Sequence, residues 1–164
     1  MKNAETLQVT TPSDQEIQIT RLFDAPRQLV FDAFTKPELL KRWLFGPDGW
    51  SLAVCEIDFR VGGKYRYVWK HLTKGTQMGM SGVIREIVVP ERLVSTEKFD
   101  DAWYPGEGAL GTVVLTEKGK QTLLTQTIRY ESKAARDTAL QTGMMEGMAT
   151  GYNRLEGVFA ELQR

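Results

Sequence analysis

Near the C-terminus, over residues 143–162, apolar residues recur at alternating steps of three and four. The positions that carry this pattern are Met145, Met148, Tyr152, Leu155, Phe159 and Leu162. This is the spacing of one face of an α-helix, so it predicts a long amphipathic helix over residues 143–162. A helix of this length spans roughly 30 Å, and its apolar face needs a partner about as wide as a small domain.

Between residues 51 and 131 the hydrophobic period changes to two, which is typical of half-buried strands. The clearest alternation places Tyr65, Tyr67, Trp69 and His71 on one side and Lys64, Arg66, Val68 and Lys70 on the other. Further strands are predicted over residues 53–59, 77–89, 93–99, 112–116 and 122–130, with a two-glycine hairpin turn at Gly62-Gly63 and a loop over residues 100–110. These strands supply the partner that the long helix requires.

The N-terminal part begins with an aperiodic polar stretch, so residues 1–14 are expected to form a flexible tail. Apolar and polar residues alternate over residues 16–23, which predicts a strand. Arg21 falls on its apolar side, so it must pair with an acid or lie near the solvent-exposed end of the strand. Two short helical patterns follow, and Asp24 and Thr35 are their predicted caps.

The order of elements is strand, two short helices, five or six antiparallel strands, a short helix over residues 132–141, and the long helix. There is no alternation of strands and helices, which argues against a parallel nucleotide-binding sheet. The pattern predicts one α+β domain over residues 15–164.

Composition and charge exclude several classes of protein. The 21 basic and 21 acidic residues balance, which argues against a nucleic-acid-binding protein. No apolar run approaches the roughly 20 residues of a membrane span, and the polar start lacks the core of a secretory signal. The single cysteine, Cys55, fits a reducing compartment, so we expect a cytoplasmic protein.

Four stretches carry a resemblance to a known family. They are ITRLFDAPRQLVFDAFTKPELLKRW (19–43), CEIDFRVGGKYRY (55–67), SGVIREIVVPERLVSTEKF (81–99) and GMMEGMATGYNRLEGVFAEL (143–162). Together they resemble the SRPBCC superfamily, which has the START-like (Bet v 1-like) helix-grip fold, and within it the branch named after the activator of heat shock protein 90 ATPase. They mark turns, caps and core, and none is a catalytic signature.

The resemblance implies a curved antiparallel sheet that grips the C-terminal helix and leaves a cavity between them. Members of the superfamily bind lipids, plant hormones or polyketides, some are cyclases, and the eukaryotic namesake assists a chaperone ATPase. This chain departs from the branch at Leu44-Phe45, where the branch usually continues an aromatic or tryptophan pair after Trp43.

The candidate cavity residues combine large amphipathic side chains with flexible thioethers, which suit a varied apolar ligand. They are Tyr65, Tyr67, Trp69, His71, Met80, Trp103, Met144, Met148 and Tyr152. Core packing is the alternative for the aromatic and methionine residues, and a solvated or structural role is the alternative for His71, the only histidine. Gly143, Gly147 and Gly151 recur every four residues along the long helix, which indicates either close packing or space for a ligand.

Three functions remain open. We expect a non-enzymatic module that binds a small lipophilic molecule; the alternatives are a chaperone-interaction module and a polyketide cyclase-like enzyme with His71, Arg21 or Tyr67 as acid or base. One histidine and one cysteine form no metal cluster, and we expect no cofactor. The sequence leaves a homodimer open.

Overall fold

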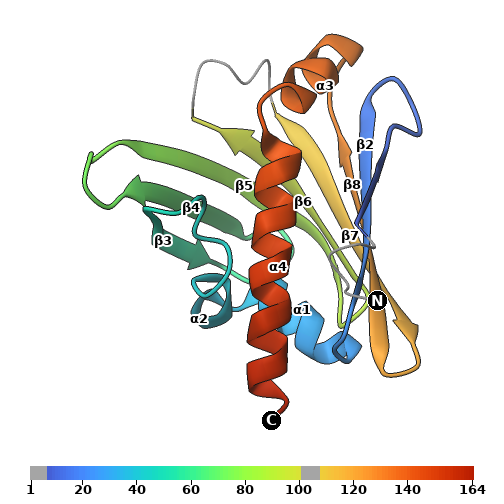
Figure 1. The fold of residues 1–164 in the computed structure, drawn as a ribbon. Helices are drawn as coiled ribbons and strands as arrows, with labels where there is room; N and C mark the ends of the chain where they lie inside the picture. The colour runs from blue at the N-terminus through green and yellow to red at the C-terminus, as the bar shows by residue number, and fades with distance from the viewer. Residues whose placement is uncertain (1–6, 101–107) are drawn as a thin grey trace.

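The chain folds into one curved antiparallel sheet with helices on its concave side (Figure 1). The computed structural model describes residues 7–100 and 108–164. Within them the strand order is β1-β2-β8-β7-β6-β5-β4-β3. The strands are β1 (Gln8–Thr10), β2 (Glu16–Phe23), β3 (Trp50–Ile57), β4 (Lys64–His71), β5 (Gln77–Val88), β6 (Arg92–Phe99), β7 (Ala109–Lys118) and β8 (Gln121–Arg129).

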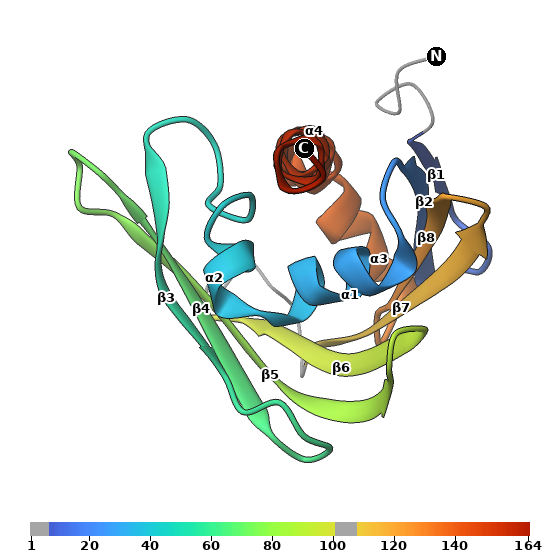
Figure 2. The same cartoon turned by 90° about the horizontal axis from the view of Figure 1, so that it is seen from below.

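The long C-terminal helix lies across the hollow of this sheet. The helices are α1 (Arg27–Thr35), α2 (Pro37–Leu40), α3 (Lys133–Leu140) and α4 (Met144–Leu162). Figure 2 shows α4 end-on, with the strands curving around it from β3 to β2 and with α1 and α2 inside the same curve. The α+β helix-grip fold is therefore confirmed.

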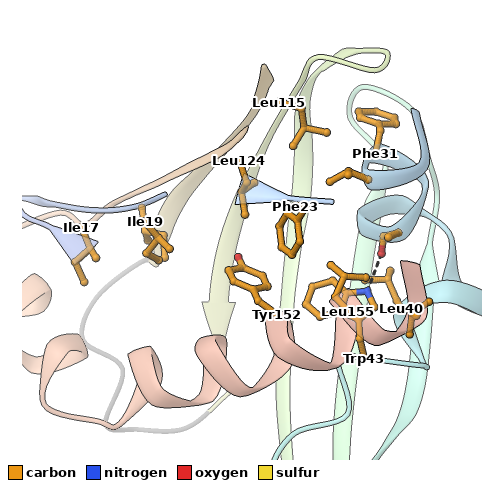
Figure 3. Close-up of a cluster of buried hydrophobic side chains, with 14 of the residues drawn as sticks. Ile17, Ile19, Phe23, Phe31, Leu40, Trp43, Leu115, Leu124, Tyr152 and Leu155 are labelled. Carbon is orange, nitrogen blue, oxygen red and sulfur yellow. Dashed lines mark hydrogen bonds between the residues drawn. The ribbon is translucent and has the colours of Figure 1, made fainter. Parts of the chain in front are cut away.

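The core forms where β2 meets α4. The concave side chains Ile17, Ile19 and Phe23 have at most 1% of their surface exposed, as their alternation predicts. The Phe23 ring makes edge contacts with Tyr152 at 5.5 Å and with Phe159 at 5.6 Å between centroids (Figure 3). Each fully buried side chain of this size stabilises the fold by about 1.5–3 kcal/mol, so this contact fixes α4 on the sheet.

Arg21 completes the contact between β2 and α4. It is 1% exposed, and its Nη1 donates to Asn153 Oδ1 over 2.9 Å. Burial lowers the pKa of its guanidinium, and the negative charge of Glu156 opposes that shift. Of the two expected arrangements, pairing with an acid or a place near the solvent-exposed end of the strand, the structure shows an electrostatic interaction with Glu156, and the hydrogen-bond partner of the guanidinium is the Asn153 amide.

Some predictions of local structure at the N-terminal end are wrong. Gln8–Thr10 pair with β2 as strand β1 instead of belonging to a loose tail. Their side chains are all exposed, so the strand is held by backbone pairing and leaves no hydrophobic pattern to detect. Neither Asp24 nor Thr35 caps a helix: Pro26 and Lys36 occupy these positions without side-chain caps, and the Thr35 hydroxyl donates to the Phe31 carbonyl.

Two strand predictions also need correction. A bulge between Leu52 and Val54 breaks the alternation expected from Ala53 to Phe59, so that Leu52 is buried and Ala53 is exposed. The turn at Gly62-Gly63 is longer than two residues, since β3 ends at Ile57 and only Gly62 has a positive φ of 85°.

Candidate functional site

The concave face has a tightly packed half, formed by β2, β8 and β7 under α4. Its inward side chains are almost completely covered: Ile17, Ile19, Phe23, Leu115, Leu124 and Ile128. Figure 3 shows several of them gathered against Tyr152 and Leu155 of α4. This half of the grip has the burial of an ordinary core.

The other half, formed by β3 to β6, is packed more loosely. The strand register places Cys55, Tyr67, Met80 and Phe99 side by side in one row across the four strands. All four are only partly buried. Other inward side chains of the same strands are buried, Tyr65 and Trp69 among them, so the partly exposed part of this half is this one row.

Two methionines of α4 pack against the core. Met144 and Met148 are partly buried and contact the core cluster. Tyr130 directly follows β8, and its hydroxyl donates to Met144 Sδ over 3.7 Å. The Met144 thioether therefore lies at the end of β8.

Glu97 is a carboxyl group on this concave face. It lies two residues before Phe99 on β6, and is partly buried. A methyl group added at Gly111 would collide with its carboxylate, so the side chain lies over the β7 backbone. Desolvation by burial raises the pKa of Glu97 to about 7.

Three tyrosines surround Glu97 from different elements. Burial raises the pKa of Tyr67, Tyr130 and Tyr152, and the negative charge of Glu97 raises each pKa further. For Tyr67 the nearby Cys55 thiol also contributes. The Tyr152 hydroxyl donates to Gln126 Oε1 on β8. The tyrosine hydroxyls therefore stay protonated at neutral pH.

Tyr65 and Trp69 of the predicted set are held by their own polar tips. Tyr65 is buried, and its hydroxyl donates to the Thr96 carbonyl over 2.5 Å. Trp69 Nε1 donates to the Leu44 carbonyl over 2.9 Å. Their rings lie 5.1 Å and 5.9 Å from that of Tyr67, so both rings support Tyr67, which is itself only partly buried.

His71 lies at the end of β4, away from this group. Its Nδ1 accepts from the backbone N–H groups of Thr73 and Lys74 over 3.3 and 3.1 Å. Its ring makes an edge contact with Trp50 at 5.4 Å. The imidazole thus stabilises the β4–β5 turn. Trp103, the remaining candidate, lies outside the described residues.

The three glycines spaced every four residues at and in α4 do not share one structural explanation. Gly143 precedes α4 with a φ of 77°, a conformation that favours glycine. A Cβ at Gly147 would meet nothing within 4 Å, and one at Gly151 would make ordinary contact with Trp43 at 3.6 Å. Close approach of the helix backbone to the sheet is therefore not the reason for these glycines.

An open hollow of about 390 Å³ lies on the opposite, convex side of the sheet. Its lining is Gln8, Thr20, Leu22, Lys118 and Leu123. Along β2 and β8 these side chains alternate with the buried ones, so this hollow is separate from the helix grip. In residues 7–100 and 108–164, no group of three His, Cys, Asp or Glu side chains could hold a metal ion, and no helix is long and apolar enough to cross a membrane.

Sequence reasoning missed Glu97, Phe99 and Tyr130. The signal for Glu97 was present, because Leu93, Glu97 and Phe99 share one side of the β6 alternation. A carboxylate on the apolar side of a strand indicates a special environment. Tyr130 carried no such signal, since its neighbours on the helix are set by tertiary packing.

Comparisons with known proteins agree with this fold. The family model described as "Activator of Hsp90 ATPase homolog 1-like protein" matches residues 24–160. A crystal structure from Rhodobacter sphaeroides is similar at 28% identity and a TM-score of 0.88, covering 94% of this chain and 98% of that one. A solution structure from Arthrobacter aurescens has 25% identity and a TM-score of 0.78, covering 94% and 91%.

A more distant similarity concerns a protein whose partner is named. The crystal structure of an HSP90 activator from Plasmodium falciparum has 24% identity and a TM-score of 0.58, covering 81% of this chain and 89% of that one. At this identity the likeness shows the fold. A search of curated proteins gave no match.

Proposed function

The chain belongs to the family of Activator of Hsp90 ATPase homolog 1-like proteins, and we propose that it is a binding module. In this proposal it holds a small apolar molecule between β4–β6 and α4. The observation that carries this proposal is the difference between the two halves of the concave face. Most inward side chains of β2, β7 and β8 are covered, whereas Tyr67, Met80 and Phe99 in one row across β4–β6 are only partly buried.

Desolvation argues that this accessible surface faces the interior. Tyr67 and Glu97 are partly exposed, yet burial is the largest cause of the raised pKa of each. A side chain in open contact with bulk water would not lose its hydration in this way. The two properties together indicate poorly hydrated surroundings for Tyr67 and Glu97.

The residues around the proposed site fit an apolar ligand. Tyr67, Met80, Phe99, Met144 and Met148 supply aromatic and thioether surface, which adapts to varied shapes. At about 0.8 kcal/mol per buried CH₂ group, an eight-carbon chain would bind with a Kd on the order of 0.1 mM. A cytoplasmic location suits such a module with its single cysteine.

The test is a titration of the protein with n-octanol, followed through the ¹³C-methyl signals of its methionines. We expect the signals of Met80, Met144 and Met148 to shift together and saturate. The variant Met148→Trp fills the space from the helix side and should weaken binding by about tenfold or more. Thr150→Trp adds the same ring on the exposed side of α4 and should leave binding unchanged.

Two results would contradict the proposal. One is the absence of saturable shifts in the wild-type protein. The other is equal weakening by Met148→Trp and Thr150→Trp, because it would place the octanol site outside the grip or reveal a general loss of structure.

The family name favours a second candidate, a module that stimulates a chaperone ATPase. Apolar side chains suited to a protein partner stand exposed where β3 joins β4, with Phe59 41% and Val61 61% exposed. If this candidate holds, added protein raises the ATP turnover of Hsp90, and Val61→Asp removes the effect. Unchanged turnover at saturating protein would eliminate it.

A further inference from the structure

Positive charge is concentrated in the hairpin formed by β4 and β5. Residues 59–85 contain no Asp or Glu, although the whole chain balances 21 basic and 21 acidic residues. The basic residues of this stretch are Arg60, Lys64, Arg66, Lys70, Lys74 and Arg85. The hairpin therefore carries a local positive field in a protein that is neutral as a whole.

The lysines near the turn between β4 and β5 are available to a partner. Arg66, in the middle of β4, is paired with Asp100 at 2.6 Å. Lys70, near the end of β4, and Lys74, in the turn, are both exposed. In the part of the chain that the structure describes, no ion pair includes either lysine. These two charges are therefore directed to solvent.

An acidic residue on the neighbouring segment leaves these charges in place. Asp48 precedes Gly49, whose carbonyl accepts the N–H of Leu72 in the turn over 2.8 Å. The Asp48 carboxylate is paired with Arg154 of α4 at 3.2 Å. Its charge is thus balanced from the helix, and the turn keeps its positive field.

The same turn presents an exposed leucine between the two lysines. Leu72 is 69% exposed, the largest exposed fraction among the large hydrophobic residues that the structure describes. The backbone around it is fixed, because His71 Nδ1 accepts from the N–H groups of Thr73 and Lys74. Figures 1 and 2 show the turn at the left-hand margin of the molecule, far from β1 and β2. The leucine is therefore held outside the core at a projecting edge.

We propose that the β4–β5 turn docks on a membrane surface that contains anionic lipids. Leu72 inserts among the lipids, and Lys70 and Lys74 lie against their headgroups. A single exposed leucine is ordinary, but an apolar tip between two lysines, on a hairpin of one charge sign, matches an anionic surface with an apolar interior. A nucleic acid would engage the lysines and gain nothing from the leucine. The inference is independent of the ligand proposed for the helix grip.

The experiment measures sedimentation of the full chain with two kinds of vesicle, phosphatidylcholine alone and phosphatidylcholine with about one third phosphatidylserine. We expect a partition constant on the order of 10³ M⁻¹ for the anionic vesicles, below the roughly 10⁴ M⁻¹ of a myristoyl chain. Binding to the neutral vesicles should be about tenfold weaker, and about 1 M salt should reduce anionic binding to the same level.

Charge substitutions test the role of the lysines. Lys70→Gln and Lys74→Gln should each weaken binding to the anionic vesicles about threefold to fivefold. The matched control is Lys120→Gln, because Lys120 is exposed in the turn between β7 and β8. Figure 1 shows that turn on the other side of the molecule, so this variant should bind as the wild type does.

Leu72 is tested by its own pair of variants. Leu72→Ser should weaken binding about tenfold, whereas Leu72→Phe keeps an apolar side chain and should retain it. Leu162, 43% exposed at the end of α4, provides the control Leu162→Ser, which should leave binding unchanged.

Three results would overturn the inference. One is a wild-type protein that sediments with neither kind of vesicle. Another is equal binding by the wild type, Lys74→Gln and Leu72→Ser. The third is binding to a short DNA duplex that falls in Lys74→Gln and persists in Leu72→Ser, without binding to vesicles, because it would assign the positive hairpin to nucleic acid.

Discussion

At the scale of single residues, Glu97 is the costliest group on the concave face. Desolvation raises the pKa of this carboxyl from 4.5 to about 7. The folded protein therefore keeps a proton that the unfolded chain releases, so the contribution of Glu97 to stability is greatest below about pH 4.5 and is lost as the pH rises to about 7. The linked change is about 3 kcal/mol, a large part of the stability of an ordinary domain.

This cost predicts the behaviour of Glu97→Gln. At about pH 8 the variant should be more stable than the wild type by about 2–3 kcal/mol, because it buries no charge. At about pH 3.5 the two should be nearly equal, since Glu97 is then mostly protonated in both states. Urea unfolding across this pH range measures the difference, and a constant difference would contradict the buried, titrating carboxyl.

Only part of the site could be predicted at this scale. Tyr67, Met80 and Met148 follow from the periods of their own elements. Glu97 also lies on the inward side of its strand, but its proximity to Tyr130 and Tyr152 depends on the curvature of the sheet. His71 shared the β4 period and yet turned to the loop, because the local N–H groups of Thr73 and Lys74 bind its ring.

At the scale of elements, α4 carries glycines that its packing does not require. A Cβ at Gly147 would meet nothing within 4 Å. Gly147→Ala should therefore raise the free energy of unfolding by up to about 1 kcal/mol, through the higher helix propensity of alanine.

Gly143, four residues before Gly147, is the matched position for an alanine substitution. Gly143 has a φ of 77°, so Gly143→Ala should lower the free energy of unfolding by about 1–2 kcal/mol. Thermal unfolding of the two variants checks both signs. Equal effects at the two positions would contradict the helix start as described.

Elements with long, clear periods were the predictable ones. The patterns of α4 and β4 extend over enough residues to define both type and face. Elements that depend on backbone groups were not predictable: β1 is held by pairing alone, and the β3 bulge at Leu52 changes the face without any change in composition. The prediction of Asp24 as a cap was wrong in a region that also depends on a distant contact: the backbone N–H of Asp24 donates to Glu156 on α4.

At the scale of the whole molecule, one helix covers two unlike halves of a single sheet. The half formed by β2, β7 and β8 is mostly packed core, and the half formed by β3 to β6 contains one row of partly buried inward side chains. We therefore expect the first half to contribute most to stability and the row in the second half to contribute to binding.

Truncations in the two halves should differ in cost. Leu124 is fully buried on β8, so Leu124→Ala should lower the free energy of unfolding by about 3–5 kcal/mol through lost burial and the cavity left behind. Met80 borders the proposed site and has fewer contacts to lose, so Met80→Ala should cost about 1 kcal/mol. Denaturant unfolding compares them, and similar large costs would indicate a solid interior on both sides.

The most direct measurement is a crystal structure of the protein with 8-bromo-octan-1-ol, located by the anomalous signal of its bromine. We expect a bromine peak between α4 and β4–β6, beside Met80 and Met148, with the chain of the probe inside the grip. Bromine peaks confined to the outer surface, together with side chains filling the space between α4 and β4–β6, would contradict ligand binding in the helix grip.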